Sequence, residues 1–250
     1  MKIAVCVKRV PDTESRIRIG AGGAGIDEAG VKFILNPYDE YAVEEALQRR
    51  EKAGAGEVIV VALGPDAAQE TIRVALAMGA DRGVLLKADA IPPDGLAVAK
   101  ALAAELRDGG YDLVLFGKLA VDDYNHQVGV MVAELLGLPC ISSVAKLAIE
   151  GGAVTAEREI EGGIEVSACA LPAVLTCDKS LNTPRYPALK GIMAAKKKPI
   201  EVKPAQLGAV RLQVAALTPP AERKEGRIVG EGVAAVPELV RLLRTEAKVL

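Results

Sequence analysis

Short aliphatic runs alternate with longer helix-like stretches through the first half of the chain, and this alternation limits the possible fold more than any other feature of the sequence. Strands are predicted at 2–8, 57–63, 83–86 and 112–116, and helices at 36–52, 67–78, 94–106 and 127–136. Strands that alternate with helices form parallel sheets joined by right-handed crossovers. We therefore predict an α/β fold built on a doubly wound, mostly parallel, Rossmann-like sheet.

Composition supports a buried sheet and argues against several classes of protein. Hydrophobic residues make up 50% of the chain and aromatic residues only 3%, so we expect an aliphatic core. The net charge of −2 provides no general attraction to nucleic acid or to a membrane surface. A single His and four cysteines without a CxxC pair give no metal-binding pattern. With no signal peptide and no apolar run of roughly 18 residues, we expect a cytoplasmic protein without membrane insertion.

The stretch 112–129 carries the most polar loop of the predicted sheet. An apolar strand runs into this loop, and a helix follows from about Gln127. Open α/β sheets present ligand sites at such strand ends, and the unpaired N–H groups of a helix start suit a phosphate. No GxGxxG follows the first strand and no GxxxxGK[ST] occurs, so other loops would have to hold a nucleotide. The alternative is an ordinary surface loop capped by Asn125 or Asp123.

A second polar cluster lies at the start of the helix predicted at 36–52. Asn36 precedes Pro37, and Asp39 and Glu40 fall in the first turn, as in a helix with a side-chain cap. The residues by themselves favour this role as a helix cap over a role at the border of a nucleotide pocket.

The pattern changes after Ser142. Short strands are predicted at 144–149, 153–158, 164–170 and 173–177 with no helices between them, which favours an antiparallel extension of the sheet. Prolines then interrupt the chain until a final helix at 236–249. We predict an α/β nucleotide-binding domain over 1–182, followed over 183–250 by an extended loop and C-terminal arm that packs on a partner subunit.

Several blocks of sequence, in order, resemble the electron transfer flavoprotein beta subunit. The resemblance covers residues 1 to 204 and rests on VKRVPD (7–12), LNPYDEYAVEEAL (35–47), ALAMGADRG (75–83), GKLAVDDYNHQ (117–127), EREIEGGIE (157–165), LPAV (171–174), LNTPRY (181–186) and IMAAKKK (192–198). It implies a heterodimer with an alpha subunit whose mobile domain holds FAD. That flavin passes electrons from dehydrogenases, such as acyl-CoA dehydrogenases of fatty acid oxidation, to a quinone-linked acceptor. The beta subunit is then an electron carrier subunit, not an enzyme, and binds one AMP structurally.

The resemblance also assigns residues by position. Its AMP contacts would be Cys6, Asn36, Pro37, Tyr38, Asp39, Leu63, Gly117, Lys118, Leu119, Ala120, Val121, Asp122, Asp123, Tyr124, Asn125, His126, Gln127 and Val128. Among these, Asp123 suits a ribose hydroxyl or the adenine amine, and the backbone of 126–128 suits the phosphate.

Partner contacts follow from the same resemblance. Leu189 would lie on a recognition loop and insert into a dehydrogenase pocket, with Ile192 and Met193 beside it. Glu159 would steady the flavin domain, and Arg185 with the lysines at 196–198 would steer an acidic partner.

Two departures from the family pattern leave alternatives open. Val128 replaces a Thr whose hydroxyl would donate to the phosphate, and Thr13 stands where the family has a Tyr near the flavin. Val128-Gly129 and Pro11-Asp12-Thr13 lean toward a bifurcating branch with a second FAD in place of AMP. The Asp-Asp-Tyr-Asn loop lacks that branch's Asp-Gly-Asp pattern, which favours AMP. Alternatives of another class are a stand-alone adenine nucleotide-binding sensor and a hydrolase that uses His126 with Asp122 or Asp123.

Overall fold

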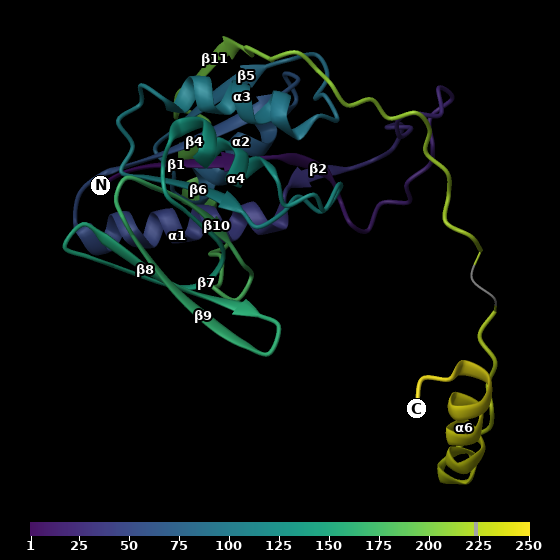
Figure 1. Cartoon of the computed structure of the whole chain (residues 1–250). Coiled ribbons are helices and arrows are strands. Elements are labelled where there is room, and N and C mark those ends of the chain that lie inside the picture. The colour runs from purple at the N-terminus through teal and green to yellow at the C-terminus, as the bar shows by residue number, and fades with distance from the viewer. Residues whose placement is uncertain (223–224) are drawn as a thin grey trace. The chain divides into compact units, whose positions relative to one another are not determined.

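The fold is seen in a computed structural model that describes residues 1–222 and 225–250 (Figure 1). Contacts divide the chain into two units, Met1–Ala216 and Leu217–Leu250.

The first unit is built on a nine-stranded sheet in the order β11-β5-β4-β1-β6-β10-β7-β8-β9. Its parallel part consists of β11 (Ile200–Pro204), β5 (Arg82–Lys87), β4 (Glu57–Gly64), β1 (Lys2–Val7), β6 (Leu113–Gly117), β10 (Ala173–Cys177) and β7 (Cys140–Glu150). The antiparallel strands β8 (Ala153–Ile160) and β9 (Gly163–Ala170) extend it beyond β7. The strands β2 (Arg9–Pro11) and β3 (Phe33–Leu35) form a separate antiparallel pair. The predicted α/β class with a mostly parallel sheet is confirmed.

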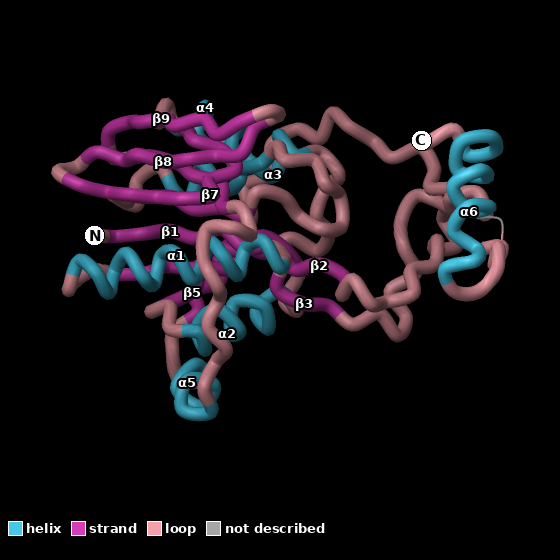
Figure 2. Tube along the Cα trace, turned by 90° about the horizontal axis from the view of Figure 1, so that it is seen from below, coloured by secondary structure: helices cyan, strands magenta, loops and turns pink. Residues whose placement is uncertain are grey.

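Helices cover both faces of the sheet (Figure 2). The helices that pack on the sheet are α1 (Pro37–Ala53), α2 (Ala68–Met78), α3 (Gly95–Leu106) and α4 (Val128–Leu136), and the short helix α5 (Leu189–Ala195) packs on α2. Side chains of a strand alternate between faces, so Ile3 and Val5 pack with α1 and α2, and Ala4 packs with α3 and α4. Most of the buried side chains are aliphatic, as composition predicts.

Two predicted features of the second half differ from the structure. The strand at 173–177 is not part of an antiparallel meander, because β10 lies between β6 and β7 and is parallel to both. All of its residues are buried, so it needs neighbours on both edges and both faces. The region after 183, predicted as extended, contains the helix α5 and the strand β11, which pairs with β5.

The second unit contains a 3₁₀ turn at Val233–Ala235, helix α6 (Val236–Leu242) and a π-helical turn at Leu243–Ala247. Among the described residues, no helix combines the length and the apolar character needed to cross a membrane.

Candidate functional site

The topology of the sheet reverses between β1 and β6. These strands are paired, with Cys6 opposite Phe116, but the chain leaves β1 toward β4 on one side and later returns to β6 on the other. In open α/β sheets, the crevice at the carboxyl ends of such strands is where ligands bind. The polar loop between β6 and α4 begins at this edge of the sheet, together with the segment after β1.

One buried carboxylate ties these two strand ends together. Asp39, in the first turn of α1, accepts hydrogen bonds from the backbone N–H of Lys8 at 2.7 Å and of Gly117 at 3.1 Å. Burial raises the pKa of Asp39 to about 7, although both backbone bonds oppose this shift. Gly117 has no room for a side chain, because a Cβ there would lie 2.4 Å from Asp39 Oδ1.

Asn36 holds the loop itself, and the prediction that its side chain caps α1 is wrong. The Asn36 side chain makes no cap bond to the helix. Instead its Nδ2 donates to the carbonyl of Leu119 at 2.8 Å, and its Oδ1 accepts from the N–H of Val121 at 3.1 Å. A buried amide that pairs with a donor and an acceptor of the loop fixes the path of that loop.

Lys8, directly after β1, forms ion pairs with two carboxylates of the loop. Its ammonium lies 2.8 Å from Asp122 and 2.9 Å from Asp123. Burial lowers the pKa of Lys8, but the two carboxylates outweigh burial and raise it above its ordinary value. The sequence reasoning missed Lys8. Its position directly after the first strand, at the same sheet edge as the loop, is the signal that could have identified it.

The far end of the loop leads into a helix start without a side-chain cap. Tyr124 and His126 both have a φ of 55°, in the left-handed region, so backbone N–H groups change direction between successive residues. Successive N–H groups arranged in this way form concave sites for anions. Gln127, at the N-cap position of α4, makes no side-chain hydrogen bond to the helix. The N–H groups at 128–130 therefore keep their capacity to donate to a phosphate.

The other predicted nucleotide residues belong to the loop, to the first turn of α1 and to the ends of β1 and β4. Pro37 and Tyr38 belong to the first turn of α1, and Lys118 follows β6, where its ammonium pairs with Asp178 at 2.7 Å. Cys6 and Leu63 are buried near the ends of β1 and β4, within the core that faces α3 and α4. Burial, and then the charge of Asp39, raise the pKa of the Cys6 thiol well above its ordinary value, so this thiol stays neutral. Ala120 and Asn125 complete the loop, and Asn125 N–H donates to Asp123 Oδ1 at 3.0 Å.

The pairing needed for a hydrolytic His–Asp dyad is not formed. Asp122 and Asp123 both contact Lys8, and no hydrogen bond joins His126 to either carboxylate among the described residues. Within the same residues no cluster of His, Cys, Asp or Glu could hold a metal ion. The arrangement offers donors and acceptors for binding and no assembled acid–base pair.

The predicted partner residues belong to other parts of the fold. Leu189 and Met193 on α5 are 75% and 64% exposed, and Ile192 is 45% exposed. Glu159 is exposed on β8, opposite Ile164 of β9. Arg185 is engaged within the chain, where its guanidinium contacts Glu44 at 2.7 Å and Glu51 at 2.6 Å on α1.

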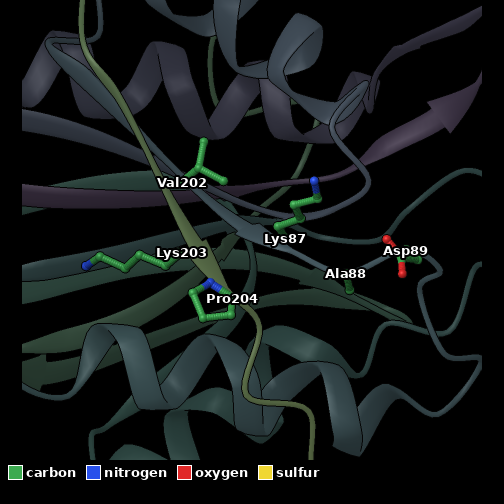
Figure 3. A pocket seen from close by; sticks show the side chains of 6 residues that line it. All are labelled: Lys87, Ala88, Asp89, Val202, Lys203 and Pro204. Atoms are coloured by element: carbon green, nitrogen blue, oxygen red, sulfur yellow. The ribbon is translucent and has the colours of Figure 1, made fainter.

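An open groove occurs elsewhere, at the ends of β5 and β11. Figure 3 shows its lining side chains, which are Lys87, Ala88, Asp89, Val202, Lys203 and Pro204. Lys87 pairs with Asp66 and Lys203 pairs with Glu105, so both cations are already neutralised. None of the predicted nucleotide residues lines this groove.

Comparisons with known proteins agree on one family. A family model described as "Electron transfer flavoprotein domain" matches residues 24–207. A protein of Bradyrhizobium diazoefficiens named "Electron transfer flavoprotein subunit beta" is 45% identical over 254 residues, with both chains covered completely. Proteins with the same name are 40% identical in Bacillus subtilis, over 100% of both chains, and 44% identical in Homo sapiens, over 90% of this chain and 91% of the human one.

Proposed function

This chain belongs to the electron transfer flavoprotein family, among its beta subunits, and from that premise we propose that it pairs with an alpha subunit and holds one AMP at the β6–α4 loop. In this proposal the chain is an electron carrier subunit without catalytic residues. The FAD held mainly by the alpha subunit would supply the redox chemistry, taking electrons from dehydrogenases such as acyl-CoA dehydrogenases and passing them to a quinone-linked acceptor.

The observation that carries the AMP proposal is the uncapped start of α4 beside the switch point of the sheet. The N–H groups of 126–128, and those of 129 and 130 in the uncapped first turn, can donate to the phosphate, which gains from the positive end of the helix dipole. Oxygens of Asp122 and Asp123 can accept from ribose hydroxyls or from the adenine amine. The residues present therefore fit an adenine nucleotide, even though Val128 provides no hydroxyl.

Asn36, Asp39 and Lys8 would give this site its shape before the nucleotide arrives. Each joins the loop or its strand to another element through hydrogen bonds or ion pairs. A loop that is already ordered loses less entropy when a ligand binds. AMP would in turn stabilise the folded chain, because a ligand that binds only the native state shifts unfolding by mass action.

The test is the nucleotide content of the heterodimer after co-expression with an alpha subunit. We expect one AMP and one FAD per heterodimer in the released ligands, identified by mass and by absorbance. Two FAD without AMP would support the bifurcating alternative. A chain that is purified as a stable monomer, with neither nucleotide, would overturn the proposal.

The exposed apolar side chains of α5 support a second part of the proposal, that electron-donating dehydrogenases dock there. Leu189, Ile192 and Met193 project from one short helix, where a projecting apolar side chain can fill a partner's pocket. Leu189→Ala should raise the dehydrogenase concentration needed for half-maximal flavin reduction about tenfold and leave the maximal rate unchanged. An unchanged half-saturation concentration would contradict docking at this surface.

A further inference from the structure

Helix α5 cannot owe its form to its own sequence. It has seven residues, and Ala188 at its N-cap position makes no side-chain cap bond. Isolated helices shorter than roughly 12 residues are marginal in water even with favourable sequences. Contacts with another part of the fold must therefore hold α5 in place.

Those contacts come from α2, which lies beside α5 (Figure 2). Ala195 is 3% exposed, and a Cβ at Gly191 would lie 2.4 Å from the carbonyl oxygen of Ala77. The two small residues are four positions apart, on one face of α5. This face approaches the backbone of α2 so closely that only glycine fits at 191.

Side chains of α2 and of the segment that follows α5 exchange hydrogen bonds in both directions. Arg73 of α2 donates through Nη1 to the carbonyls of Ala195 at 2.5 Å and Lys198 at 2.6 Å. Lys198, just after α5, donates through Nζ to the carbonyls of Leu76 at 3.0 Å and Ala80 at 2.5 Å. Leu76 and Ala195 lie in the last turns of their helices, where carbonyls lack a partner four residues on, and the carbonyls of Ala80 and Lys198 lie just beyond the helix ends. The Ala195 carbonyl also accepts from the N–H of Lys198, so Arg73 adds a second donor there.

We propose that this reciprocal pair, Arg73 and Lys198, positions α5 for docking, so that the apolar side chains of α5 meet a partner already ordered. The proposal rests on the docking role proposed above for Leu189. Lys198 then acts through its carbonyl bonds and not as a steering charge, in contrast to the exposed Lys197 beside it. A preorganised surface binds more tightly because less entropy is lost on association.

The first measurement is hydrogen exchange of the full chain. Lys198→Met and Arg73→Met each remove a donor while keeping most of the aliphatic stem, and Lys197→Met removes a charge from the same lysine run as the matched control. We expect amides of 189–195 to exchange at least tenfold faster in the first two variants and at the wild-type rate in Lys197→Met and Leu189→Ala.

The second measurement is flavin reduction in the heterodimer by an acyl-CoA dehydrogenase with its substrate. We expect Lys198→Met and Arg73→Met to raise the half-saturating dehydrogenase concentration three- to tenfold at an unchanged maximal rate, with Lys197→Met changing it less than twofold. If either variant fails to fold, Arg73→Lys, which keeps the charge but lacks the guanidinium fork, replaces it.

The outcomes separate the two proposals. The positioning role of Arg73 and Lys198 is overturned if Lys198→Met and Arg73→Met both keep the wild-type exchange rate of 189–195, or both keep the wild-type half-saturating dehydrogenase concentration, while Leu189→Ala raises that concentration. An equal loss in Lys197→Met also overturns it, because charge alone would then explain the effect. An unimpaired Leu189→Ala contradicts docking itself, whereas the exchange rates would still report whether the two cations order α5.

Discussion

Asp39 Oδ1 lies 3.1 Å from the backbone nitrogen of Gly117, and this hydrogen bond joins the first turn of α1 to the end of β6. The other carboxylate oxygen accepts from the N–H of Lys8, so a single side chain connects the ends of the two strands that flank the switch point. The close contact leaves no space for a Cβ at Gly117.

Gly117→Ala should therefore destabilise the chain. Its Cβ would lie 2.4 Å from Asp39 Oδ1 and 2.7 Å from the carbonyl carbon of Tyr38, which forces the backbone to move. We expect a loss of about 1–3 kcal/mol in the free energy of unfolding, measured by urea denaturation. Gly163→Ala is the control, since a Cβ there meets no atom within 4 Å and should change stability by less than about 0.5 kcal/mol. Equal effects in both variants would argue against the close contact.

Asp39→Asn should change how stability depends on pH. Burial raises the pKa of Asp39 to about 7, above the ordinary value of 3.8, so the folded state binds more protons than the unfolded state between these values. The contribution of Asp39 to stability is then full below pH 4 and falls as pH rises toward 7, by at most about 1.4 kcal/mol per pH unit.

Denaturation curves measured between about pH 5 and pH 8 test this sign. The stability difference between wild type and Asp39→Asn should shrink as pH rises, because the asparagine does not titrate. The buried thiols of Cys6 and Cys177 do not interfere, because burial raises their pKa values well above the ordinary value. Asp108→Asn, at an exposed position, should follow the wild-type profile. A difference that grows with pH would contradict a raised pKa.

Asn36→Ala should loosen the β6–α4 loop. The variant leaves the carbonyl of Leu119 and the N–H of Val121 without their partner, at a cost of about 1–3 kcal/mol. We expect faster proteolysis within 118–127 and loss of AMP from the purified heterodimer. Asn36→Asp keeps the acceptor for Val121 but replaces the donor to Leu119. Its AMP retention should lie between those of wild type and Asn36→Ala, or below that of Asn36→Ala. Full AMP retention in Asn36→Ala would show that the loop does not depend on this amide.

Lys8→Met should weaken nucleotide binding through the same loop. It leaves Asp122 and Asp123 as adjacent negative charges without their shared cation. The folded pKa of Lys8 is raised above 10.5, so the interaction is fully present at neutral pH and is lost only at higher pH. For a partly exposed pair we expect about 1 kcal/mol, or about fivefold in the dissociation constant of AMP measured by calorimetry.

Lys32→Met serves as the control for Lys8→Met. Lys32 also pairs with an aspartate, Asp12, but its side chain is 75% exposed. It should leave AMP affinity unchanged, and an equal loss in both variants would point to general charge effects.

Arg185→Met should release the segment that leads to α5. Burial raises the pKa of Glu44, but hydrogen bonds from Arg185 and Gln48 outweigh it and lower the pKa below its ordinary value. The stabilisation is therefore present above about pH 4.5 and is lost as pH falls further. We expect a loss of about 1–2 kcal/mol at pH 7, since Glu44 is buried and its carboxylate would keep no cation.

The expected difference between Arg185→Met and wild type should disappear in acid, as measured by thermal unfolding between about pH 3 and pH 7. Arg241→Met is the matched control, because Arg241 pairs with Glu238 on an exposed helix turn. Exposed pairs contribute little, so its effect should stay below about 1 kcal/mol. A similar loss in both variants would mean that burial of Glu44 does not matter.

Local patterns were sufficient to predict most of the first unit. Ile3, Val5 and their alternation identify a buried strand, and Asp94 caps α3 through bonds to Leu96 and Ala97, as its position before an apolar helix predicts. The polar loop after 117 was placed at a strand end by the same means. Each of these features depends on neighbours within a few residues along the chain.

Predictions failed where a side chain finds its partner far along the sequence. Asn36 was expected to cap the helix that begins beside it, but it bonds to Leu119, 83 positions away. The local pattern also gave no sign that Arg185 contacts Glu44, 141 positions away, and its expected role toward a partner stays a prediction. No local pattern distinguishes a capping amide from one that reaches another loop.

The sequence by itself determined the periodicity of the strands and helices and the polarity of the loops, because these follow from side-chain chemistry and local backbone preference. Only the tertiary structure decided that Asp39 would join β1 to β6, and that Arg73 and Lys198 would hold a helix too short to persist alone. The physical reason is that burial sets the strength of such bonds, and burial exists only after distant segments have packed together.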